Sequence, residues 1–272
     1  MTFATKYGPW ALVAGASDGV GAAFAAGLAE RGVNVVLLAR RQAVLDHVAA
    51  EIKSRTSVET HTLAVDLTEP GAASAITAAT RDLEIGFLVY CAGADPNFKP
   101  FLANPVEAAE AMVQRNCVVP MQLCHHYAPA MVQRGRGGIV IFGSGAGLAG
   151  SPNIVTYGAS KAFDMVFAEG LWAELHDKGV DVLGLILGKT DTPALRQLEH
   201  SRGQISSTDD VPPGAAAVDD VIAEAFENLA NGPTWMVGAD MRAAVPMMAS
   251  LTRRQIVELM TQASIAAMGS AD

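Results

Sequence analysis

Short, continuous apolar runs alternate with longer helical stretches along this chain, and the alternation constrains the fold more than any other feature. Consecutive Val, Ile and Leu residues are typical of strands buried on both faces, as in a parallel sheet. The expected strands are 11–14, 33–39, 62–65, 87–92, 139–142, 182–187 and 234–237. The expected helices are 20–31, 42–55, 70–82, 105–134, 153–178 and 218–231. The pattern predicts an α/β fold: a doubly wound parallel sheet of about seven strands with helices on both faces.

The composition favours one domain over residues 1–272, because half of the residues are hydrophobic and no repeat or long linker divides them. The net charge is −9 and no block of Lys or Arg stands out, so we expect no nucleic-acid partner. No apolar run reaches the roughly 18 residues of a membrane-spanning helix, and the chain does not open on a signal-peptide pattern. We therefore expect a cytoplasmic protein that does not bind membranes.

The cysteines and histidines give no metal-binding pattern. Cys91, Cys117 and Cys124 are odd in number and lack a ligand spacing with histidine, so we expect free thiols in a reducing compartment. His125 and His126 are neighbours, and neighbouring side chains on a helix point in different directions. We predict no metal site.

A glycine-rich segment, Gly15-Ala-Ser-Asp-Gly19-Val-Gly21, directly follows the first expected strand and opens the first expected helix. Gly15 permits a tight turn, Gly19 lets a pyrophosphate approach the backbone, and Gly21 lets the helix lie close to the sheet. The N–H groups at the start of the helix then face the anion. This Rossmann-like context predicts a dinucleotide site.

Arg40 follows the second expected strand, where a chain that selects NAD usually carries an acid for the ribose 2′-hydroxyl. An arginine suits the additional 2′-phosphate of NADP, so we predict NADP(H) rather than NAD(H). Asp18 in the glycine-rich segment argues against that choice, because a carboxylate would repel the phosphate. Asp66, after the third expected strand, either accepts from the adenine amino group or caps a helix.

Tyr157-Gly-Ala-Ser-Lys161 places a phenol and an ammonium four residues apart, on one face of an expected helix. A fixed cation within about 4–6 Å lowers the pKa of a phenol, which is otherwise near 10. Tyr157 can then donate a proton to a carbonyl oxygen or accept one from an alcohol. Ser144 lies thirteen residues before Tyr157, in a Gly-Ser-Gly-Ala-Gly run.

Together these motifs resemble the short-chain dehydrogenase/reductase family over roughly residues 8–195. Residues 14–21 are similar to its Gly-x-x-x-Gly-x-Gly loop, and residues 90–93 lie where the family has Asn-Asn-Ala-Gly. Asn116 falls in the long helix that carries the family's active-site asparagine. Residues 188–192 resemble the segment that lies along the nicotinamide.

The resemblance implies an NADP(H)-dependent oxidoreductase that interconverts a hydrophobic ketone and a secondary alcohol. Tyr157 would act as general acid or base, and Lys161 would lower its pKa and bond the nicotinamide ribose. Ser144 would donate to the substrate oxygen, and Asn116 would hold a water that links Lys161 to solvent. The implied cofactor contacts are Gly15, Ser17, Gly19, Val20, Gly21, Arg40, Asp66, Leu67, Ala92, Gly93, Tyr157, Lys161, Gly188, Thr190 and Thr192.

The sequence departs from the family pattern at three places. Leu187 replaces a proline before the nicotinamide segment. Tyr90 and Cys91 replace two asparagines, which removes two side-chain amides that brace the sheet edge. Asp18 stands where many NADP-dependent members have a basic residue. These departures bear on cofactor affinity, because none of them removes a predicted catalytic group.

The substrate is less constrained than the reaction. Residues 189–216 are predicted to be a long connection that serves as a substrate loop or lid, and 251–268 to be a terminal helix after a Met-rich stretch. The predicted pocket comprises Ala94–Phe98, Leu148, Gly150, Ile154 and 193–216. A steroid, a long-chain or aromatic ketone and a β-ketoacyl thioester all remain open. Arg196 or Arg202 offers a cation to an anionic substrate.

Two other functions remain beside the dehydrogenase. A non-catalytic NADP-binding redox sensor or scaffold keeps the fold, but it needs no Tyr157 proton donor. Epimerase or dehydratase chemistry ranks lower, because the chain is too short for the larger substrate domain of those relatives. The resemblance also implies a homodimer or homotetramer paired through helices 105–134 and 153–178.

Overall fold

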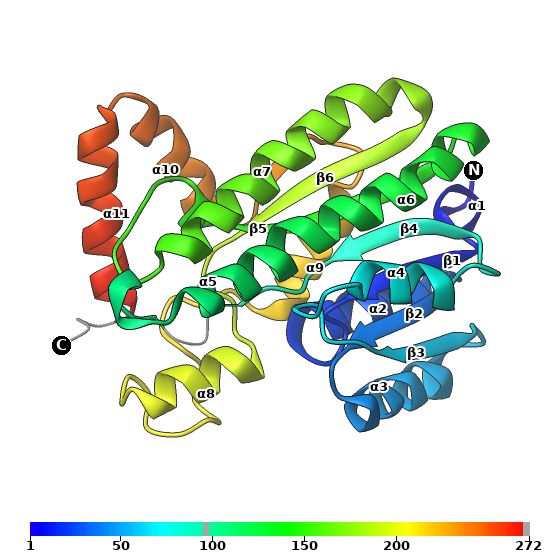
Figure 1. Ribbon diagram of the computed structural model, residues 1–272, viewed down its shortest axis with the longest axis horizontal. Helices are drawn as coiled ribbons and strands as arrows, with labels where there is room; N and C mark the ends of the chain where they lie inside the picture. The colour runs from blue at the N-terminus through cyan, green and yellow to red at the C-terminus, as the bar shows by residue number, and fades with distance from the viewer. Residues whose placement is uncertain (95–97, 269–272) are drawn as a thin grey trace.

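The computed structural model describes residues 1–94 and 98–268, and its seven described strands form one parallel sheet in the order β3-β2-β1-β4-β5-β6-β7. The strands are β1 Trp10–Ala14, β2 Asn34–Ala39, β3 Thr60–Ala64, β4 Ile85–Tyr90, β5 Gly137–Ser144, β6 Val180–Leu187 and β7 Thr234–Met236. The order steps outward from β1 in one direction and then from β4 in the other, so the carboxyl ends of β1 and β4 flank a crevice. The predicted fold class is confirmed (Figure 1).

The helices cover both faces of this sheet (Figure 1). The α-helices are α1 Phe3–Tyr7, α2 Gly19–Glu30, α3 Gln42–Arg55, α4 Ala72–Ala79, α5 Val106–Val113, α6 Val119–Arg134, α7 Val155–Leu175, α8 Pro193–Ser201, α9 Val218–Glu227, α10 Ala239–Ala249 and α11 Arg253–Met268. Shorter turns are η1 Phe101–Ala103, η2 Gln114–Val118, η3 Gly145–Gly147 and η4 His176–Lys178. Among the described residues, no helix is both long and apolar enough to cross a membrane.

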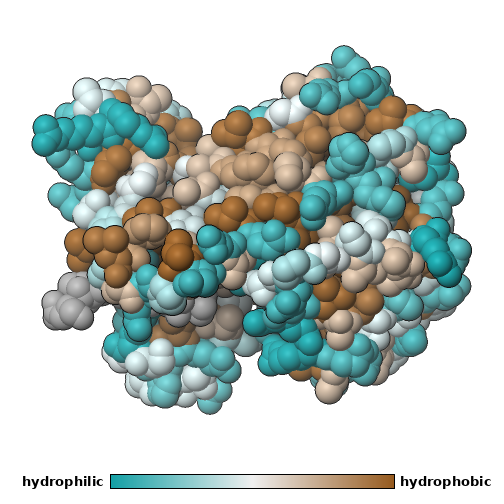
Figure 2. Space-filling view, in the orientation of Figure 1, coloured by the Kyte–Doolittle hydropathy of each residue, from teal (hydrophilic) through white to brown (hydrophobic). Residues whose placement is uncertain are grey.

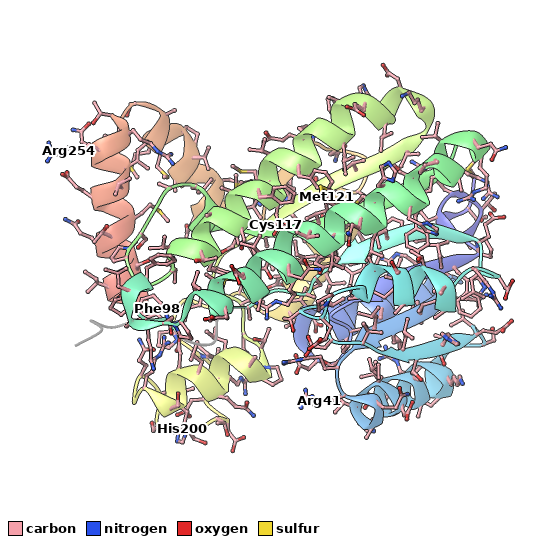
Figure 3. The ribbon with its side chains drawn as sticks, viewed as in Figure 1. Arg41, Phe98, Cys117, Met121, His200 and Arg254 are labelled. Atoms are coloured by element: carbon pink, nitrogen blue, oxygen red, sulfur yellow. The ribbon has the colours of Figure 1, made fainter. Side chains whose placement is uncertain are left out.

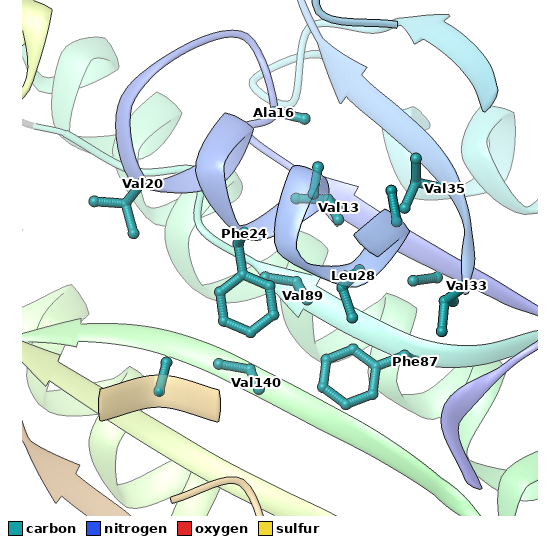
Figure 4. Close-up of a cluster of buried hydrophobic side chains, with 14 of the residues drawn as sticks. Val13, Ala16, Val20, Phe24, Leu28, Val33, Val35, Phe87, Val89 and Val140 are labelled. Atoms are coloured by element: carbon teal, nitrogen blue, oxygen red, sulfur yellow. The ribbon is translucent and has the colours of Figure 1, made fainter. Parts of the chain in front are cut away.

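Two hydrophobic clusters hold the layers together, because successive residues of a strand point to opposite faces. On one face, Val13 and Phe87 pack against Phe24 and Leu28 of α2 (Figure 4). The other cluster joins strand residues such as Leu12 to α4, α6 and α7. Every residue of β4 is buried, which explains why the central strands appear in the sequence as unbroken apolar runs.

The helix predicted over 105–134 is interrupted. It consists of α5, the π-helical turn η2 and α6. Pro120 lies in the first turn of α6 and has no N–H, so it cannot donate to the carbonyl of Asn116 four residues earlier. The N–H of Val119 instead bonds the carbonyl of Gln114, five residues back. The widened turn places Asn116 beside the sheet, and π turns of this kind occur frequently at functional sites.

Residues 189–216 contain a helix that the sequence analysis did not predict. Thr192 caps α8 by accepting from the N–H of Leu195, and Pro193 occupies its first turn. The cap and the proline are helix-start signals that the polar composition of the segment obscured. A bridge between Thr190 and Ala216 brings the ends of the segment together. Its expected role as a lid stays a prediction.

The C-terminal part also differs from the prediction. The Met-rich stretch forms a separate helix, α10, and the terminal helix α11 begins at Arg253 rather than at 251. The short helix α1 was not predicted either, and Tyr7 in it packs edge-on against Phe87. The helices α1 and α10 are too short or too irregular in pattern to be recognised without their packing partners.

Hydrophobic residues gather between α6 and α7 on the surface shown in Figure 2. Met121 of α6, labelled in Figure 3, lines a groove there with Phe167 and Leu171 of α7. Val166, also on α7, is 60% exposed. These are the helices expected to pair across a subunit interface, and the homo-oligomer stays a prediction.

Candidate active site

The glycine-rich loop lies at the carboxyl end of β1, where it turns into α2. Gly15 has φ +91°, and the N–H groups of Gly15 and Ala16 bond the carbonyl of Leu38 at 2.8 and 3.1 Å. A Cβ on Gly15 would lie 2.9 Å from the backbone nitrogen of Ala92, and one on Gly21 would lie 2.1 Å from the carbonyl oxygen of Gly15. Side chains there would fill the space between β1, β4 and α2.

The glycine loop also contacts the segment that follows β6. A Cβ on Gly19 would lie 3.0 Å from Cγ2 of Thr192, the residue that caps α8. Residues far apart in sequence therefore meet across one cleft. The predicted residues that line it are Gly15, Gly19, Val20, Gly21, Gly93, Ser144, Tyr157, Lys161, Gly188, Thr190 and Thr192. Ser17, Arg40, Asp66, Leu67, Ala92 and Asn116 are not among the lining residues.

Three charged residues surround the end of β2. Arg40 is exposed directly after β2. Asp18 lies 3.4 Å from Arg41, and both side chains are partly exposed (Figure 3 labels Arg41). This pairing offsets part of the negative charge that the sequence analysis weighed against a 2′-phosphate.

Asp66 accepts from the backbone N–H of Thr68 at 2.9 Å and from its hydroxyl at 2.8 Å. The backbone hydrogen bond from Thr68 is the main reason that the pKa of Asp66 lies below its ordinary value, and Arg40 adds to it. Asp66 therefore stabilises its own turn. The alternative that Asp66 caps a helix is wrong, because the residue that precedes α4 is Gly71. Leu67 beside it is buried.

Tyr157 and Lys161 lie one turn apart on α7, and both face the cleft. The ammonium nitrogen of Lys161 is 5.8 Å from the centroid of the Tyr157 ring. Lys161 is 4% exposed, and its Nζ donates to the carbonyl of Phe142 at 2.8 Å and to Oδ2 of Asp164 at 2.9 Å. The predicted proximity of phenol and ammonium is therefore present in the structure.

Burial alone would lower the pKa of Lys161, but the Asp164 carboxylate and Tyr157 raise it, and the net direction is upward. The lysine therefore carries its positive charge beside the phenol. Burial raises the pKa of Asp164, which the Lys161 ammonium opposes. Sequence reasoning missed Asp164, because its i,i+3 spacing from Lys161 does not show whether the carboxylate is buried or solvated.

Ser144 is the last residue of β5. Its Oγ accepts from the N–H of Ala146 at 3.2 Å, which fixes the side chain at the start of η3. Because the oxygen acts as the acceptor in this bond, the hydroxyl proton stays available to an acceptor in the cleft. Ser144 lines the same cleft as Tyr157.

Asn116 is fully buried and lies behind the cleft wall. Its Nδ2 donates to Oγ of Ser160 at 2.9 Å, and Ser160 donates to the carbonyl of Tyr157 at 2.8 Å. Arg115 donates from Nε to Oδ1 of Asn116 at 2.9 Å. A Cβ on Gly93 would lie 2.8 Å from the same oxygen. The asparagine thus ties the π turn to α7 and lies close to Gly93 in the segment after β4.

Tyr90 forms a brace that the sequence analysis did not anticipate. Its hydroxyl donates to the backbone carbonyl of Arg115, which joins the end of β4 to the π turn. The expectation that Tyr90 removes a brace at this edge was wrong. The phenol is long enough to reach the Arg115 carbonyl and braces the edge itself. Arg115 also donates from Nη2 to the carbonyl of Ala94 at 2.7 Å.

The three cysteines are free, as predicted. Burial raises the pKa of Cys91 to about 12, of Cys117 to about 11 and of Cys124 to about 12. Their thiols therefore stay protonated at neutral pH, and Cys91 contributes neutral lining to the cleft. Within the described ranges, no cluster of three or more His, Cys, Asp or Glu has the geometry of a metal site.

The C-terminal helices contact the loop after Ser144. Met241 of α10 lies against Gly145 and Gly188, within 3.2–3.4 Å of where a Cβ on either would stand. Arg253 donates to the carbonyl of Leu148 at 3.0 Å, and Ser151 donates to the carbonyl of Met260 at 3.4 Å. The Met-rich stretch therefore lies against the loops after β5 and β6, a position that its sequence alone left undecided.

The predicted pocket residues Ile154, Gly150 and Phe98 do not line the cleft and differ in exposure. Ile154 is buried at the start of α7, Gly150 is exposed, and Phe98 is buried beneath the guanidinium of Arg202, 4.9 Å from its ring centroid. Figure 3 shows Phe98 on the side of α8. Of the predicted segment Ala94–Phe98, residues 95–97 lie outside the described residues.

The comparisons with known proteins agree with this geometry. The sequence profile described as short chain dehydrogenase matches residues 9–203. The chain belongs to the short-chain dehydrogenase family. A 7β-hydroxysteroid dehydrogenase of Collinsella aerofaciens is 36% identical over 84% of this chain and 86% of its own length. The protein is therefore an enzyme of an oxidoreductase family.

Solved structures of family members show the same architecture. A structure from a study of 7β-hydroxysteroid dehydrogenase stereoselectivity has a TM-score of 0.86 and 33% identity, covering 96% of this chain and 99% of its own. A short-chain dehydrogenase from Sphingobium yanoikuyae in complex with NADPH has a TM-score of 0.74 and 29% identity, covering 90% and 96%. The family binds a nicotinamide cofactor. The glycine loop fits such a group, because a Cβ at Gly15, Gly19 or Gly21 would collide with neighbouring atoms.

Proposed function

We propose that this protein catalyses the NADP(H)-dependent interconversion of a bulky hydrophobic ketone, of the steroid class, and the corresponding secondary alcohol. The observation that carries the proposal is the arrangement of Ser144, Tyr157 and Lys161 around the cleft that the glycine loop enters. A pure binding protein needs the glycine loop but no proton donor beside it, so the non-catalytic alternative is less favoured.

In the proposed reaction, Tyr157 donates its phenolic proton to the carbonyl oxygen during reduction and accepts a proton during oxidation. Lys161, fixed by the Phe142 carbonyl, places a positive charge beside the phenol. Ser144 donates its hydroxyl proton to the same substrate oxygen and stabilises the charge that develops there. The nicotinamide, when bound, supplies or accepts the hydride.

Asn116 contributes through its backbone in this proposal. Because Pro120 has no N–H, the Asn116 carbonyl lacks the usual helical partner and is suited to accept from a water. Such a water would return protons from solvent to Lys161. The Asn116 side chain accepts a hydrogen bond from Arg115 and donates one to Ser160. The second bond holds α7 against the π turn.

The cofactor contacts assigned from the sequence belong to the same proposal. The glycine loop would hold the pyrophosphate, and Arg40 the 2′-phosphate of NADP(H). The pairing of Asp18 with Arg41 supports this preference, as does the NADPH complex of the family member from S. yanoikuyae.

The steroid class is supported by the relatives and by the lining. Relatives named 7β-hydroxysteroid dehydrogenase match most of this chain, for example at 36% and 35% identity. Met241, Phe98 and Ile154 are apolar side chains near the substrate side, and adaptable apolar linings suit bulky, rigid ketones.

The test is NADPH oxidation by the purified protein with steroid ketones and small aliphatic ketones. We expect turnover with the steroids, and Tyr157→Phe should lower it by about 10²-fold or more, the scale of acid–base catalysis. NADPH binding by the variant should be retained. Tyr127→Phe is the matched control, because that phenol bonds Thr80 away from the cleft.

Turnover of Tyr157→Phe within about threefold of the native chain would remove Tyr157 from the mechanism. Tight NADPH binding without turnover of any ketone would favour the sensor or scaffold alternative. Turnover of small ketones in preference to steroids would contradict the substrate class alone.

A further inference from the structure

Asp164 is a buried carboxylate directly beneath the cleft. It lies on α7, three residues after Lys161, and its side chain is 2% exposed. Its Oδ2 accepts from Nζ of Lys161 at 2.9 Å, and the lysine side chain is itself 5% exposed. An ion pair sealed from solvent thus lies one helical turn from Tyr157.

Fold stability gives little reason for such a pair. Taking two charges out of water costs several kcal/mol per ion, and well-packed apolar side chains often stabilise a core at least as well. Oδ1 of Asp164 has no hydrogen-bond partner among the described residues, so the carboxylate is incompletely compensated. The ion pair therefore costs stability and includes Lys161 of the proposed active site. Its role is best sought in the function of that lysine.

The surroundings leave Lys161 as the counter-ion of Asp164. From β4 the carboxylate faces Tyr90, from the π turn Cys117, and from α6 Cys124. Burial raises the pKa of each of these groups, so all are neutral near pH 7. Cys91 and Tyr157 interact electrostatically with Lys161 instead. The charge of Arg115 interacts electrostatically with Tyr90.

The pair also determines where the ammonium points. A lysine ammonium has three protons to donate. In Lys161 one is directed to the Phe142 carbonyl and one to Asp164, which leaves the third for the cleft that the side chain lines. Without Asp164, a long and flexible side chain would be held by a single bond.

We propose that Asp164 is a positioning residue for Lys161: it fixes the ammonium beside Tyr157 and offsets part of its charge. The negative charge of Asp164 opposes formation of the phenolate anion, which favours ketone reduction over alcohol oxidation. The inference rests on the proposed function, because it concerns the same tyrosine and lysine.

The decisive variant is Asp164→Asn, which keeps the shape and an acceptor oxygen but removes the charge. Alcohol oxidation needs the phenolate, and the Asp164 carboxylate disfavours that anion. The variant should therefore reach half of its limiting oxidation rate about one pH unit lower than the native chain. In Asp164→Glu, which keeps the charge, the pH of half-limiting oxidation rate should return most of the way to that of the native chain.

A second readout does not use the cofactor or a substrate. Phenolate absorbance is titrated in the native chain and in Tyr157→Phe, and the difference isolates Tyr157. Burial raises the pKa of the other three tyrosines, Tyr7, Tyr90 and Tyr127, so they interfere little. The midpoint of the difference should fall by about one pH unit in the Asp164→Asn background.

Asp177→Asn is the matched control, since it removes a carboxylate that is 90% exposed just after the same helix, and neither midpoint should move. If Asp164→Asn does not fold, Asp164→Ser, which leaves room for a water beside Lys161, replaces it.

An unchanged midpoint in a folded variant, or one that moves to higher pH, would overturn the proposal. A native chain inactive on every ketone would refute the proposed function, while the absorbance titration would still decide the role of Asp164.

Discussion

The two ends of the cleft are built in different ways. At the nucleotide end, the backbone of the glycine loop is packed so closely that a Cβ on Gly21 would approach the Gly15 carbonyl to 2.1 Å. The loop is bonded to β2 through main-chain groups and lies against β4. Its shape is therefore set by the sheet itself.

The other end, which we propose binds the substrate and call the substrate end, is held by side chains. Arg196 joins α8 to Asp191 through two bonds of 2.6 and 2.7 Å, and Arg242 of α10 donates to Glu224 of α9 at 2.6 Å. These ion pairs are partly exposed, and the helices that they hold expose many of their residues. Such contacts are individual side-chain bonds, in contrast to the main-chain bonds of the nucleotide end.

Gly21→Ala should give the largest effect, because the new methyl group has no space between α2 and the Gly15 carbonyl. We expect NADPH affinity to fall by about 100-fold and the free energy of unfolding to fall by about 1–3 kcal/mol, the usual cost of overpacking. Cofactor titration and denaturant unfolding measure the two effects.

The control is Gly170→Ala on α7, where a Cβ meets nothing within 4 Å. That change should leave cofactor binding unaltered and raise the free energy of unfolding by about 0.5–1 kcal/mol, because alanine is the better helix former. Equal affinities for NADPH in the two variants would remove the contrast between the two ends.

Arg40→Ala should have an intermediate effect that is specific to the cofactor. Losing a charge-assisted bond of about 1.5–3 kcal/mol lowers NADPH affinity by about 10- to 100-fold, while NADH affinity stays nearly unchanged. Parallel titrations with both cofactors measure this, with Arg81→Ala as a surface control. A loss that follows Arg41→Ala instead would reassign the phosphate contact to Arg41, and tighter NADH than NADPH in the native chain would reject the NADP preference.

Arg196→Met should give the smallest effect, confined to the substrate end. Releasing α8 from Asp191 should raise the KM for the ketone by about threefold and leave NADPH affinity unchanged, because exposed ion pairs contribute little. Arg254→Met on α11 is the control: that side chain is 89% exposed and lies away from α8 (Figure 3). A matching loss of NADPH affinity in Arg196→Met would show that the two ends are coupled.

The difference between the ends also explains which parts of the site were predictable. The glycine loop follows a strand and opens a helix, so each glycine has a recognisable task in the local sequence. Tyr157 and Lys161 are four residues apart on one helix, so their common face follows from helical spacing. The structure places all of these residues on one cleft.

Other features depended on contacts between distant segments. The brace from Tyr90 to Arg115 spans 25 residues, and the contacts of Met241 with Gly145 and Gly188 join the C-terminal part to loops after β5 and β6. The helix in 189–216 was missed, because polar composition outweighed the capping signal at Thr192. For Tyr90 and Met241 the deciding partner lies outside any window that sequence periodicity examines, whereas the signal for α8 was local and was outweighed.

By itself, the sequence determined the parallel sheet, the position of the glycine loop and the spacing of Tyr157 and Lys161, because strand burial and helical periodicity act over a few neighbouring residues. Only the tertiary structure decided that the Asp164–Lys161 pair is sealed from solvent, that Asn116 is fully buried in a π turn, and that α10 lies against the loops after β5 and β6. Whether a charge is solvated or buried depends on the packing of elements that the sequence order keeps apart.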